Sequence, residues 1–332
     1  MPSTMDRRVV HLILAPYHTG IIDHGVGRGP RYLLLRGLKE SLEAVGAIVT
    51  CSWLAYASDE FEGDIGRSFG VIREIAHHVD MATRAGHFPV ALAGNCNATV
   101  GVAAALRPKS FGVVWFDAHA DLDTPYETVS GYFDGMGVSM LAGQSWRALM
   151  ETVPGHEALP LQRFVYCGVR DLSEPQTKKL EECPAQVVYG GDLGRAHFPL
   201  EFGEAMNRTD FTEAVVHIDL DCLDTTIGKA NEYAAPGGLQ EVDLLNCLFV
   251  LSTKVRPLAL TVASFDPTLE GGDQIADAGV RAIVSLVSQV LGPGRLPDHQ
   301  PLTATADTPS SPLDGEARNS LKDRNDRKIQ DP

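Results

Sequence analysis

The chain has 332 residues, of which 44% are hydrophobic and 21% charged, so it can bury a substantial core as one large α/β domain or two smaller ones. Its formal net charge of −15 argues against nucleic acid or an anionic membrane surface as a partner. No apolar run appears long enough to cross a membrane, and the six cysteines contain no CxxC pair, which is typical of a reducing cytoplasm. We therefore expect a soluble cytoplasmic protein.

Short apolar runs alternate with segments of helical periodicity along the chain. In chain order we expect strands at 9–16, 47–52, 89–94, 113–116, 163–169, 187–189, 215–219 and 258–265. The expected helices lie at 32–45, 69–85, 99–106, 138–149, 175–182, 200–206, 241–252 and 275–291. This alternation implies βαβ crossovers and a mainly parallel sheet, which places ligands beyond the carboxyl ends of its strands.

The composition changes after Gly292, where polar and charged residues replace nearly all apolar ones. Such a segment cannot bury enough apolar surface to fold by itself. We expect residues 1–292 to form the α/β domain and residues 293–332 to form a polar, disordered tail.

The apolar run at 113–116 ends abruptly in Asp117-Ala118-His119-Ala120-Asp121. In an extended segment alternate side chains share a face, so Asp117, His119 and Asp121 are expected to point the same way. Two carboxylates and an imidazole suit Mn²⁺, Zn²⁺, Fe²⁺ or Co²⁺ better than Ca²⁺. For this triplet alone, an acidic strand end that faces water is an equally good interpretation.

A second apolar run, at 215–218, ends in Asp219-Leu220-Asp221, and its two carboxylates are again expected to share a face. Adjacent strand ends would then present four carboxylates and a histidine to one cavity. Carboxylates that close repel one another unless cations neutralise them. Two divalent metal ions bridged by carboxylates resolve that conflict.

These two motifs resemble those of the arginase/agmatinase/formimidoylglutamase (ureohydrolase) superfamily over roughly residues 9–291. Further matching segments are 25–30, 123–125, 130–131, 135–136, 168–171 and 237–238. The resemblance implies a three-layer α/β/α sandwich with a mainly parallel central sheet, two Mn²⁺ ions, and a homo-oligomer that is a trimer or hexamer. It also implies that a hydroxide bridging the ions attacks a guanidinium carbon, after which urea departs.

Carried over residue by residue, the resemblance assigns Asp117 and Asp219 as metal bridges, Asp121 to the deeper ion, and His119 and Asp221 to the other. The other candidates also come from the resemblance: Cys96 completes the metal ligands, the catalytic candidates are Asp121 and Asp134, and the substrate-binding candidates are Asp123, Ser130, Tyr132, Glu232, Tyr233, Ser264 and Asp266.

Two departures from the family pattern concern the metal ions and the proton. Cys96 stands where a metal-binding histidine is expected, and a thiolate shifts the preference toward Zn²⁺. The alternative is an inert buried thiol beside a single metal ion. Asp134 stands where the family has a proton-shuttle histidine. A buried carboxyl with a raised pKa can act as an acid or base, and the alternative is a cap of the following helix.

Two further departures concern the substrate. Ser264 replaces the glutamate that contacts a guanidinium group, and Asp266, two residues on in an extended segment, is expected to substitute for it. Asp123 and Tyr132 replace the asparagines that contact the carboxylate of arginine. An acidic Asp123 would repel that carboxylate, so L-arginine itself is not the expected substrate.

We therefore predict a binuclear-metal hydrolase of a linear C–N bond in a guanidino- or amidino-type small molecule. One alternative is a non-catalytic ureohydrolase-like subunit, and another is a hydrolase of a neutral amide or ureido compound. Retention of the four aspartates and His119 favours catalysis. His18 and His24 are interpreted as exposed loop histidines, with a place in the pocket wall as the alternative.

Overall fold

The main sheet of the protein, in a computed structural model that describes residues 8–55, 63–107, 109–191 and 197–292, has eight strands that pair in parallel. Their order across the sheet is β4-β1-β5-β10-β9-β6-β7-β8. The strands are β1 (Val9–Ala15), β4 (Ile48–Trp53), β5 (Phe88–Ala93), β6 (Gly112–Phe116), β7 (Phe164–Val169), β8 (Gln186–Tyr189), β9 (Glu213–Asp219) and β10 (Arg256–Ala263). A short antiparallel pair, β2 (Tyr17–His18) and β3 (Ile21–Ile22), follows β1. The predicted tail, 293–332, lies outside the described residues.

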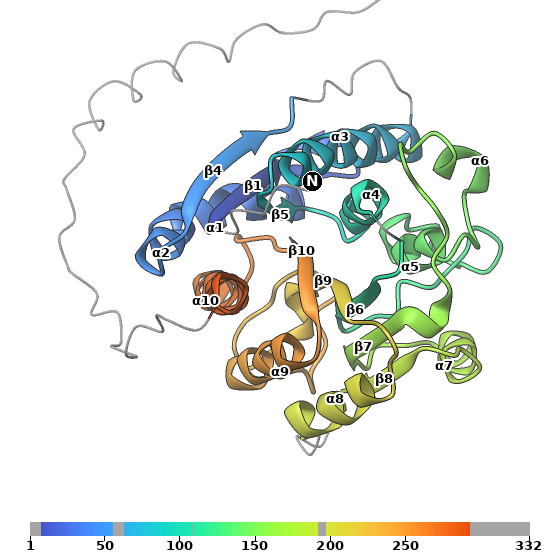
Figure 1. Cartoon of the computed structure of the whole chain (residues 1–332). Helices are drawn as coiled ribbons and strands as arrows, with labels where there is room; N and C mark the ends of the chain where they lie inside the picture. The colour runs from blue at the N-terminus through green and yellow to red at the C-terminus, as the bar shows by residue number, and fades with distance from the viewer. Residues whose placement is uncertain (1–7, 56–62, 108, 192–196, 293–332) are drawn as a thin grey trace, which may run out of the picture. The chain divides into compact units, whose positions relative to one another are not determined.

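Helices cover both faces of the sheet, so the predicted three-layer α/β/α sandwich is confirmed (Figure 1). One face carries α3 (Asp64–Arg84), α4 (Ala98–Ala105) and α5 (Gly137–Leu141), with α6 (Arg147–Met150) farther out. The other face carries α1 (Gly29–Leu35), α2 (Leu38–Ala44), α8 (Phe198–Asn207), α9 (Glu241–Lys254) and α10 (Gly272–Leu291). Helix α7 (Glu174–Glu181) connects β7 to β8, and the short 3₁₀ turns are η1 (Gly25–Arg28), η2 (Asp134–Met136), η3 (Leu161–Arg163) and η4 (Leu220–Cys222).

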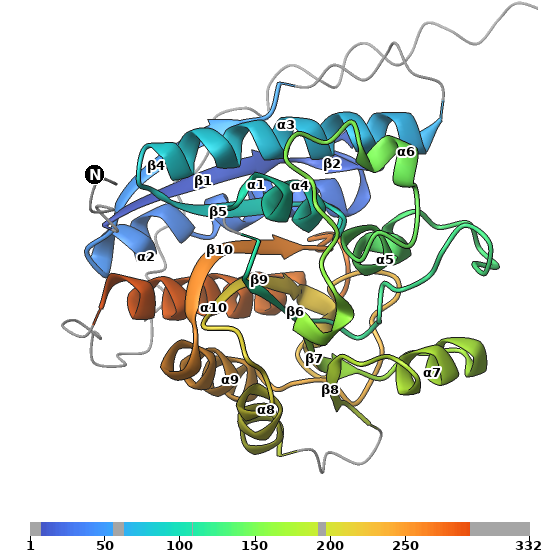
Figure 2. The ribbon, with the colours of Figure 1, turned by 45° about the vertical axis from the view of Figure 1, so that its right-hand side comes forward.

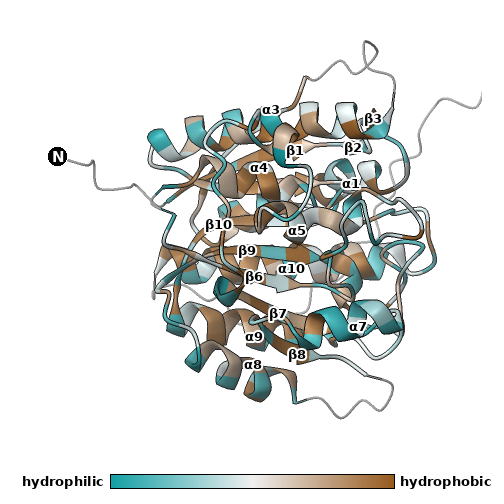
Figure 3. Ribbon diagram, turned by 90° about the vertical axis from the view of Figure 1, so that its right-hand side faces the viewer, coloured by the Kyte–Doolittle hydropathy of each residue, from teal (hydrophilic) through white to brown (hydrophobic). Residues whose placement is uncertain are grey.

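The sheet separates two apolar cores because successive side chains of each strand point to opposite faces. On β1, Val10, Leu12 and Leu14 lie in the core under α2 and α10, whereas Ile13 and Ala15 lie in the core under α3. Apolar residues fill the central strands, while α7 and the outward turns of α3 are largely polar (Figure 3). Burial on both faces explains why the strands read as continuous apolar runs.

The strand order brings four chemically important loops together. Strands β5, β10, β9 and β6 are neighbours in the middle of the sheet, and all run in the same direction (Figure 2). The residues that follow them directly are 94–97, 264–266, 220–224 and 117–121. The metal-ligand candidates and the candidates Ser264 and Asp266 therefore emerge at one edge of the sheet.

Three predicted elements differ from the structure. The helix predicted at 32–45 is two helices, α1 and α2, because Gly37 between them has φ 82°. The helix predicted at 138–149 is likewise interrupted between α5 and α6, where Gly143 has φ 69°. The strand predicted at 258–265 ends at Ala263, since Ser264 has φ 61° and leaves the extended conformation. Helical periodicity survives such breaks, so the pattern alone does not reveal them.

Helix α10 is long and apolar enough to cross a membrane by length and composition, contrary to the expectation that no such run exists. More than half of its apolar window, 56%, is buried inside the protein. Ile275, Ile283 and Leu286 on this helix are fully buried in the core between α10 and the sheet. Its apolar length is thus used in packing against the sheet.

Candidate metal centre

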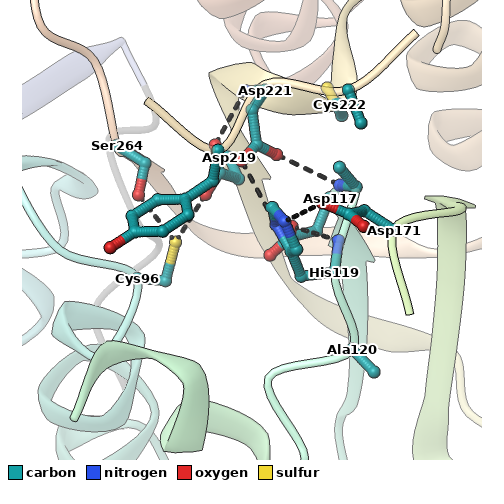
Figure 4. A network of polar contacts seen from close by, with 12 residues as sticks. Cys96, Asp117, His119, Ala120, Asp171, Asp219, Asp221, Cys222 and Ser264 are labelled. Atoms are coloured by element: carbon teal, nitrogen blue, oxygen red, sulfur yellow. Dashed lines mark hydrogen bonds and ion pairs between the residues drawn. The ribbon is translucent and has the colours of Figure 1, made fainter. Parts of the chain in front are cut away.

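The carboxylates of Asp117, Asp219 and Asp221 and the imidazole of His119 meet where β6 and β9 end (Figure 4). One ligand atom each of Asp117, His119 and Asp221 lies within 4.8 Å of those of the other two. Asp219 lies beside them, and the carboxylates of Asp117, Asp219 and Asp221 are almost completely buried. Asp121 approaches the same cluster from the loop that follows β6.

The side chains that follow β6 converge through a turn, and the prediction that strand alternation aligns them is wrong. The strand ends at Phe116, and Asp121 has φ 46°, in the left-handed region. Asp117 Oδ1 accepts a hydrogen bond from His119 N (2.7 Å), and Asp117 Oδ2 accepts one from Trp115 Nε1 (2.8 Å). These bonds hold the first carboxylate against the turn that carries the imidazole.

A 3₁₀ turn, η4, positions the second acidic pair, so Asp219 and Asp221 also do not share a face of an extended strand. Asp219 Oδ1 accepts from Asp221 N at 2.7 Å and caps this turn. Asp221 receives two hydrogen bonds from elsewhere in the chain, from Ala118 N (3.1 Å) and from Asn231 Nδ2 (2.9 Å). The Asp221 carboxylate is therefore oriented before any ligand binds.

Cys96 contacts the acidic cluster from the turn that precedes α4. Its Sγ lies 2.9 Å from Asp219 Oδ2 and 3.1 Å from Ser264 Oγ, and Figure 4 shows these three side chains pointing toward one another. Asp134 accepts hydrogen bonds from Asn95 Nδ2 (2.7 Å), Cys96 N (3.0 Å) and Asn97 N (2.9 Å). Asp134 thus caps the start of α4, whereas the cap considered from the sequence was one of the following helix.

Burial and mutual repulsion raise the pKa values of three aspartates in this cluster, so their carboxyl groups hold protons more tightly than free aspartates do. Burial and the charge of Asp221 raise the pKa of Asp117 to about 6. Burial and neighbouring aspartates also raise the pKa values of Asp121 and Asp219 well above the usual range. Burial disfavours a charged His119, but Asp221 and Asp117 outweigh it and raise its pKa. Asp121 Oδ2 is buried with no hydrogen-bond partner in the described part of the chain. Cations would relieve both features, so these residues fit divalent metal ions.

A cavity of about 600 Å³ opens above the cluster. Apart from Asp117, which lies beneath its floor, all residues predicted for the site line its wall: Cys96, His119, Asp121, Asp123, Ser130, Tyr132, Asp134, Asp219, Asp221, Glu232, Tyr233, Ser264 and Asp266. Tyr132 and Tyr233 lie side by side in this lining, with their rings tilted by 33° and ring centroids 5.4 Å apart. The structure therefore brings the predicted residues together around one space.

Two of the predicted substrate-binding residues, Asp266 and Asp123, make contacts that the sequence did not predict. Asp266 lies 3.5 Å from Arg28 and is not aligned with Ser264 along an extended segment, because the strand has already ended. Asp123 accepts from Gln176 Nε2 at 3.1 Å through both of its oxygens. His18, which is half-buried, and His24, which is exposed as interpreted from the sequence, both line the cavity, with their rings 5.6 Å apart.

Comparison with known proteins agrees with this geometry. The model of the arginase family matches residues 8–288. The arginase of Eremothecium gossypii is 30% identical over 286 residues, which are 79% of this chain and 70% of that protein. The chain belongs to the arginase family.

Two further arginases are similar to this chain over most of its length. The mitochondrial arginase-2 of Homo sapiens is 26% identical over 331 residues, 92% of this chain and 91% of that protein. The crystal structure of arginase from Bacillus cereus has a TM-score of 0.74 at 21% identity, covering 84% of this chain and 98% of that one. Arginase-family members are metal-dependent ureohydrolases, so the predicted superfamily and the predicted class, a hydrolase of non-peptide C–N bonds, are confirmed.

Sequence reasoning missed several residues of this arginase-family site. Asn231 orients Asp221, Asn95 contacts Asp134, and Gln176 contacts Asp123. His217, fully buried on β9, is a further omission, although it belongs to the quoted motif that contains Asp219. Its position two residues before an aspartate at a strand end was the available signal, since residues i and i+2 of a strand share a face.

Proposed function

We propose that this protein is a binuclear-metal hydrolase of a linear C–N bond in a guanidino- or amidino-type small molecule, with urea or a related product. The observation that carries the proposal is that Asp121, Asp219, Asp221 and His119 line one cavity and that Asp117 lies against His119 and Asp221. A cavity of about 600 Å³ is of the size that holds small metabolites.

The proposed metal ligands divide between two positions. Asp117 and Asp219 are shared, Asp121 and Cys96 serve the deeper position, and the outer position takes His119 and Asp221. When bound, two divalent cations lower the pKa of the water they share and stabilise the charge that develops at the reacting carbon. The chain contributes orientation: the hydrogen bonds from Asn231 and Ala118 fix the Asp221 carboxylate.

The two catalytic candidates, Asp121 and Asp134, differ in whether their carboxylate oxygens already accept hydrogen bonds. Both oxygens of Asp134 accept hydrogen bonds from the start of α4, so this carboxylate is engaged in positioning Cys96. Asp121 Oδ2 is buried, with no partner among the described residues. We therefore favour Asp121 over Asp134 as the group that holds a proton next to the substrate.

The cavity wall supports a substrate other than L-arginine. Ser264 is neutral and lies against Cys96 Sγ, so it supplies no charge to pair with a guanidinium group. Asp123 is acidic, and its engagement with Gln176 does not remove its repulsion of a carboxylate. The neutral Ser264 favours one second candidate, the hydrolysis of a neutral amide or ureido compound.

Three finer features belong to the same proposal. We propose Mn²⁺ as the metal, with Zn²⁺ as the alternative that the Cys96 sulfur introduces. We also propose that the protein forms a trimer or hexamer and that it is located in the cytoplasm. Elemental analysis, light scattering of the purified protein and cell fractionation check these features one by one.

The function is tested by loading the purified protein with Mn²⁺ or Zn²⁺ and measuring urea release from a panel of guanidino and amidino compounds. Asp221→Asn should lower kcat/KM by about 100-fold or more, because it removes a charged ligand that the chain orients. Glu151→Gln, which changes an exposed acid, should leave it unchanged. Ammonia release from amide or ureido compounds alone would favour the second candidate. Turnover of neither class by the metal-loaded protein would support a non-catalytic subunit.

A further inference from the structure

His217 is a buried imidazole that none of the proposed roles uses. It lies on β9 and pairs across the sheet with Trp115 on β6. The two rings stack with their centroids 3.7 Å apart, and neither side chain is exposed to solvent. The indole of Trp115 donates to Asp117 Oδ2, so this stack adjoins the shared carboxylate of the metal centre.

One ring nitrogen of His217 has a hydrogen-bond partner among the described residues, and the other has none. Nδ1 lies 2.8 Å from Thr99 Oγ1 on α4. Nε2 is buried and has no hydrogen-bond partner in residues 8–55, 63–107, 109–191 and 197–292. A buried polar nitrogen without a partner destabilises the folded state, so its presence calls for an explanation. Histidines that bind metals show this same arrangement, in which one nitrogen binds the ion and the other is fixed by a hydrogen bond.

The free imidazole has suitable neighbours for a metal ion. One ligand atom each of Cys96, Asp117 and His217 lies within 4.8 Å of those of the other two, and all three residues are buried. The sulfur and nitrogen ligands of a tetrahedral Zn²⁺ lie about 3.6 Å apart, given bonds of about 2.3 and 2.1 Å. The group must therefore close by at most about 1 Å to bind an ion.

We propose that His217 supplies the imidazole of the deeper metal position, which Cys96, Asp117 and His217 form together. This inference rests on the proposed binuclear centre and changes its ligand set. The family places a histidine at position 96 of this chain, and here the imidazole would come from β9 instead. The resulting donor set of sulfur, nitrogen and oxygen prefers Zn²⁺ or Co²⁺ over Mn²⁺.

The two groups of ligand atoms make the two metal positions chemically unequal. Asp117 belongs to both groups, so its carboxylate lies between the positions. The outer group, Asp117, His119 and Asp221, combines two carboxylates with one imidazole and suits Mn²⁺. The deeper group contains a thiol and suits a softer ion. A protein given both metals should therefore bind Zn²⁺ in the deeper position and Mn²⁺ in the outer one.

The first test is the metal stoichiometry and affinity of the full chain, measured by titration with Zn²⁺ and by elemental analysis after dialysis. His217→Phe keeps a ring against Trp115 but removes both nitrogens. We expect two equivalents in the wild type, and one in His217→Phe and in Cys96→Ala. The double variant should lose no more than either single variant, because both act on the same ion. His11→Phe, which changes a half-buried histidine bonded to Thr50 and Ser52, should retain both equivalents.

The two proposals fail in different ways. A wild type that binds no metal after loading would remove the binuclear centre and this inference with it. A wild type that binds two equivalents, together with an unchanged His217→Phe, would overturn the role of His217 and leave the proposed function standing.

A measurement on the wild type avoids any effect of the substitutions on folding. X-ray absorption of the protein with one equivalent of Zn²⁺ should show one sulfur and at least one imidazole around the ion. In His119→Ala the imidazole signal should persist, because His217 provides it. A shell without sulfur, or one that loses its imidazole in His119→Ala, would contradict the proposed ligand set.

Discussion

At the scale of single residues, the position of Cys96 depends on Asp134. The Asp134 carboxylate accepts hydrogen bonds from the side chain of Asn95 and from the backbone of Cys96 and Asn97. A carboxylate at the start of a helix also interacts favourably with the helix dipole. Burial is the main cause that raises the pKa of Asp134 to about 6, against the opposing effect of these hydrogen bonds. One acidic side chain therefore anchors the turn that carries the thiol.

We predict that Asp134→Asn lowers the free energy of unfolding by about 1–3 kcal/mol. An asparagine offers one acceptor oxygen and one NH₂ group, so one of the three buried N–H donors would face another donor. Urea denaturation monitored by circular dichroism measures the change. Asp80→Asn, which breaks an exposed pair with Arg84, should cost less than about 1 kcal/mol. Equal losses in the two variants would contradict the anchoring role.

At the scale of elements, Arg170 after β7 connects the loops around the site. Its guanidinium group donates to backbone carbonyl groups in three segments of the chain. The accepting carbonyl groups belong to Gly168, Asp221, Leu223 and Ala235, at distances of 2.9, 2.8, 3.2 and 2.8 Å. The planar guanidinium of arginine reaches several acceptors in fixed directions, which a lysine ammonium cannot do. Arg170 thereby holds η4 and the irregular segment 225–238 against the sheet.

Arg170→Lys should reduce the free energy of unfolding by roughly 2–4 kcal/mol, on the order of one to two hydrogen bonds from a charged donor. It should also weaken metal binding, since Asp221 lies in the segment that is released. Thermal unfolding and Zn²⁺ titration give the two readings. The matched variant is Arg163→Lys, whose exposed guanidinium donates to the carbonyl of Ser110. A destabilisation as large in Arg163→Lys would show that the effect does not come from the site loops.

At the scale of the whole molecule, the central strands end in a cluster of like charges. Asp117, Asp219 and Asp221 are buried at the junction of β6 and β9, where their mutual repulsion opposes folding. The two apolar cores on either side of the sheet offset this cost. A cation that binds the folded chain and not the unfolded chain adds to stability through mass action.

Removal of metal by a chelator should therefore lower the midpoint of thermal unfolding. At a free metal concentration one hundred times the Kd, binding adds about 2.7 kcal/mol to the free energy of unfolding. Differential scanning calorimetry with and without added Zn²⁺ measures the shift. Asp221→Asn should respond less, because it lacks one ligand. Identical midpoints with and without metal in the wild type would count against a metal centre in the folded protein.

Much of the fold was predictable because its signals are local. Apolar runs bounded by polar residues predict the eight main strands, and the acidic ends of the runs at 113–116 and 215–218 predict where the site lies. The breaks at Gly37 and Gly143 were not predictable from periodicity, since a glycine within a helical pattern is compatible with a continuous helix. The irregular segment after β9 carries no periodic pattern, and its course depends on Arg170.

The sequence by itself determined the family, the parallel α/β sandwich, and many of the side chains that surround the cavity. These follow from short motifs and from the rule that parallel strands end at one edge of a sheet. Tertiary structure decided the partners: Cys96 meets Asp219, 123 positions away, and Thr99 meets His217, 118 positions away. It also decided that turns, rather than extended strands, aim the carboxylates, as the positive φ of Asp121 shows. Contacts between distant segments depend on strand order and register, and a local pattern contains neither.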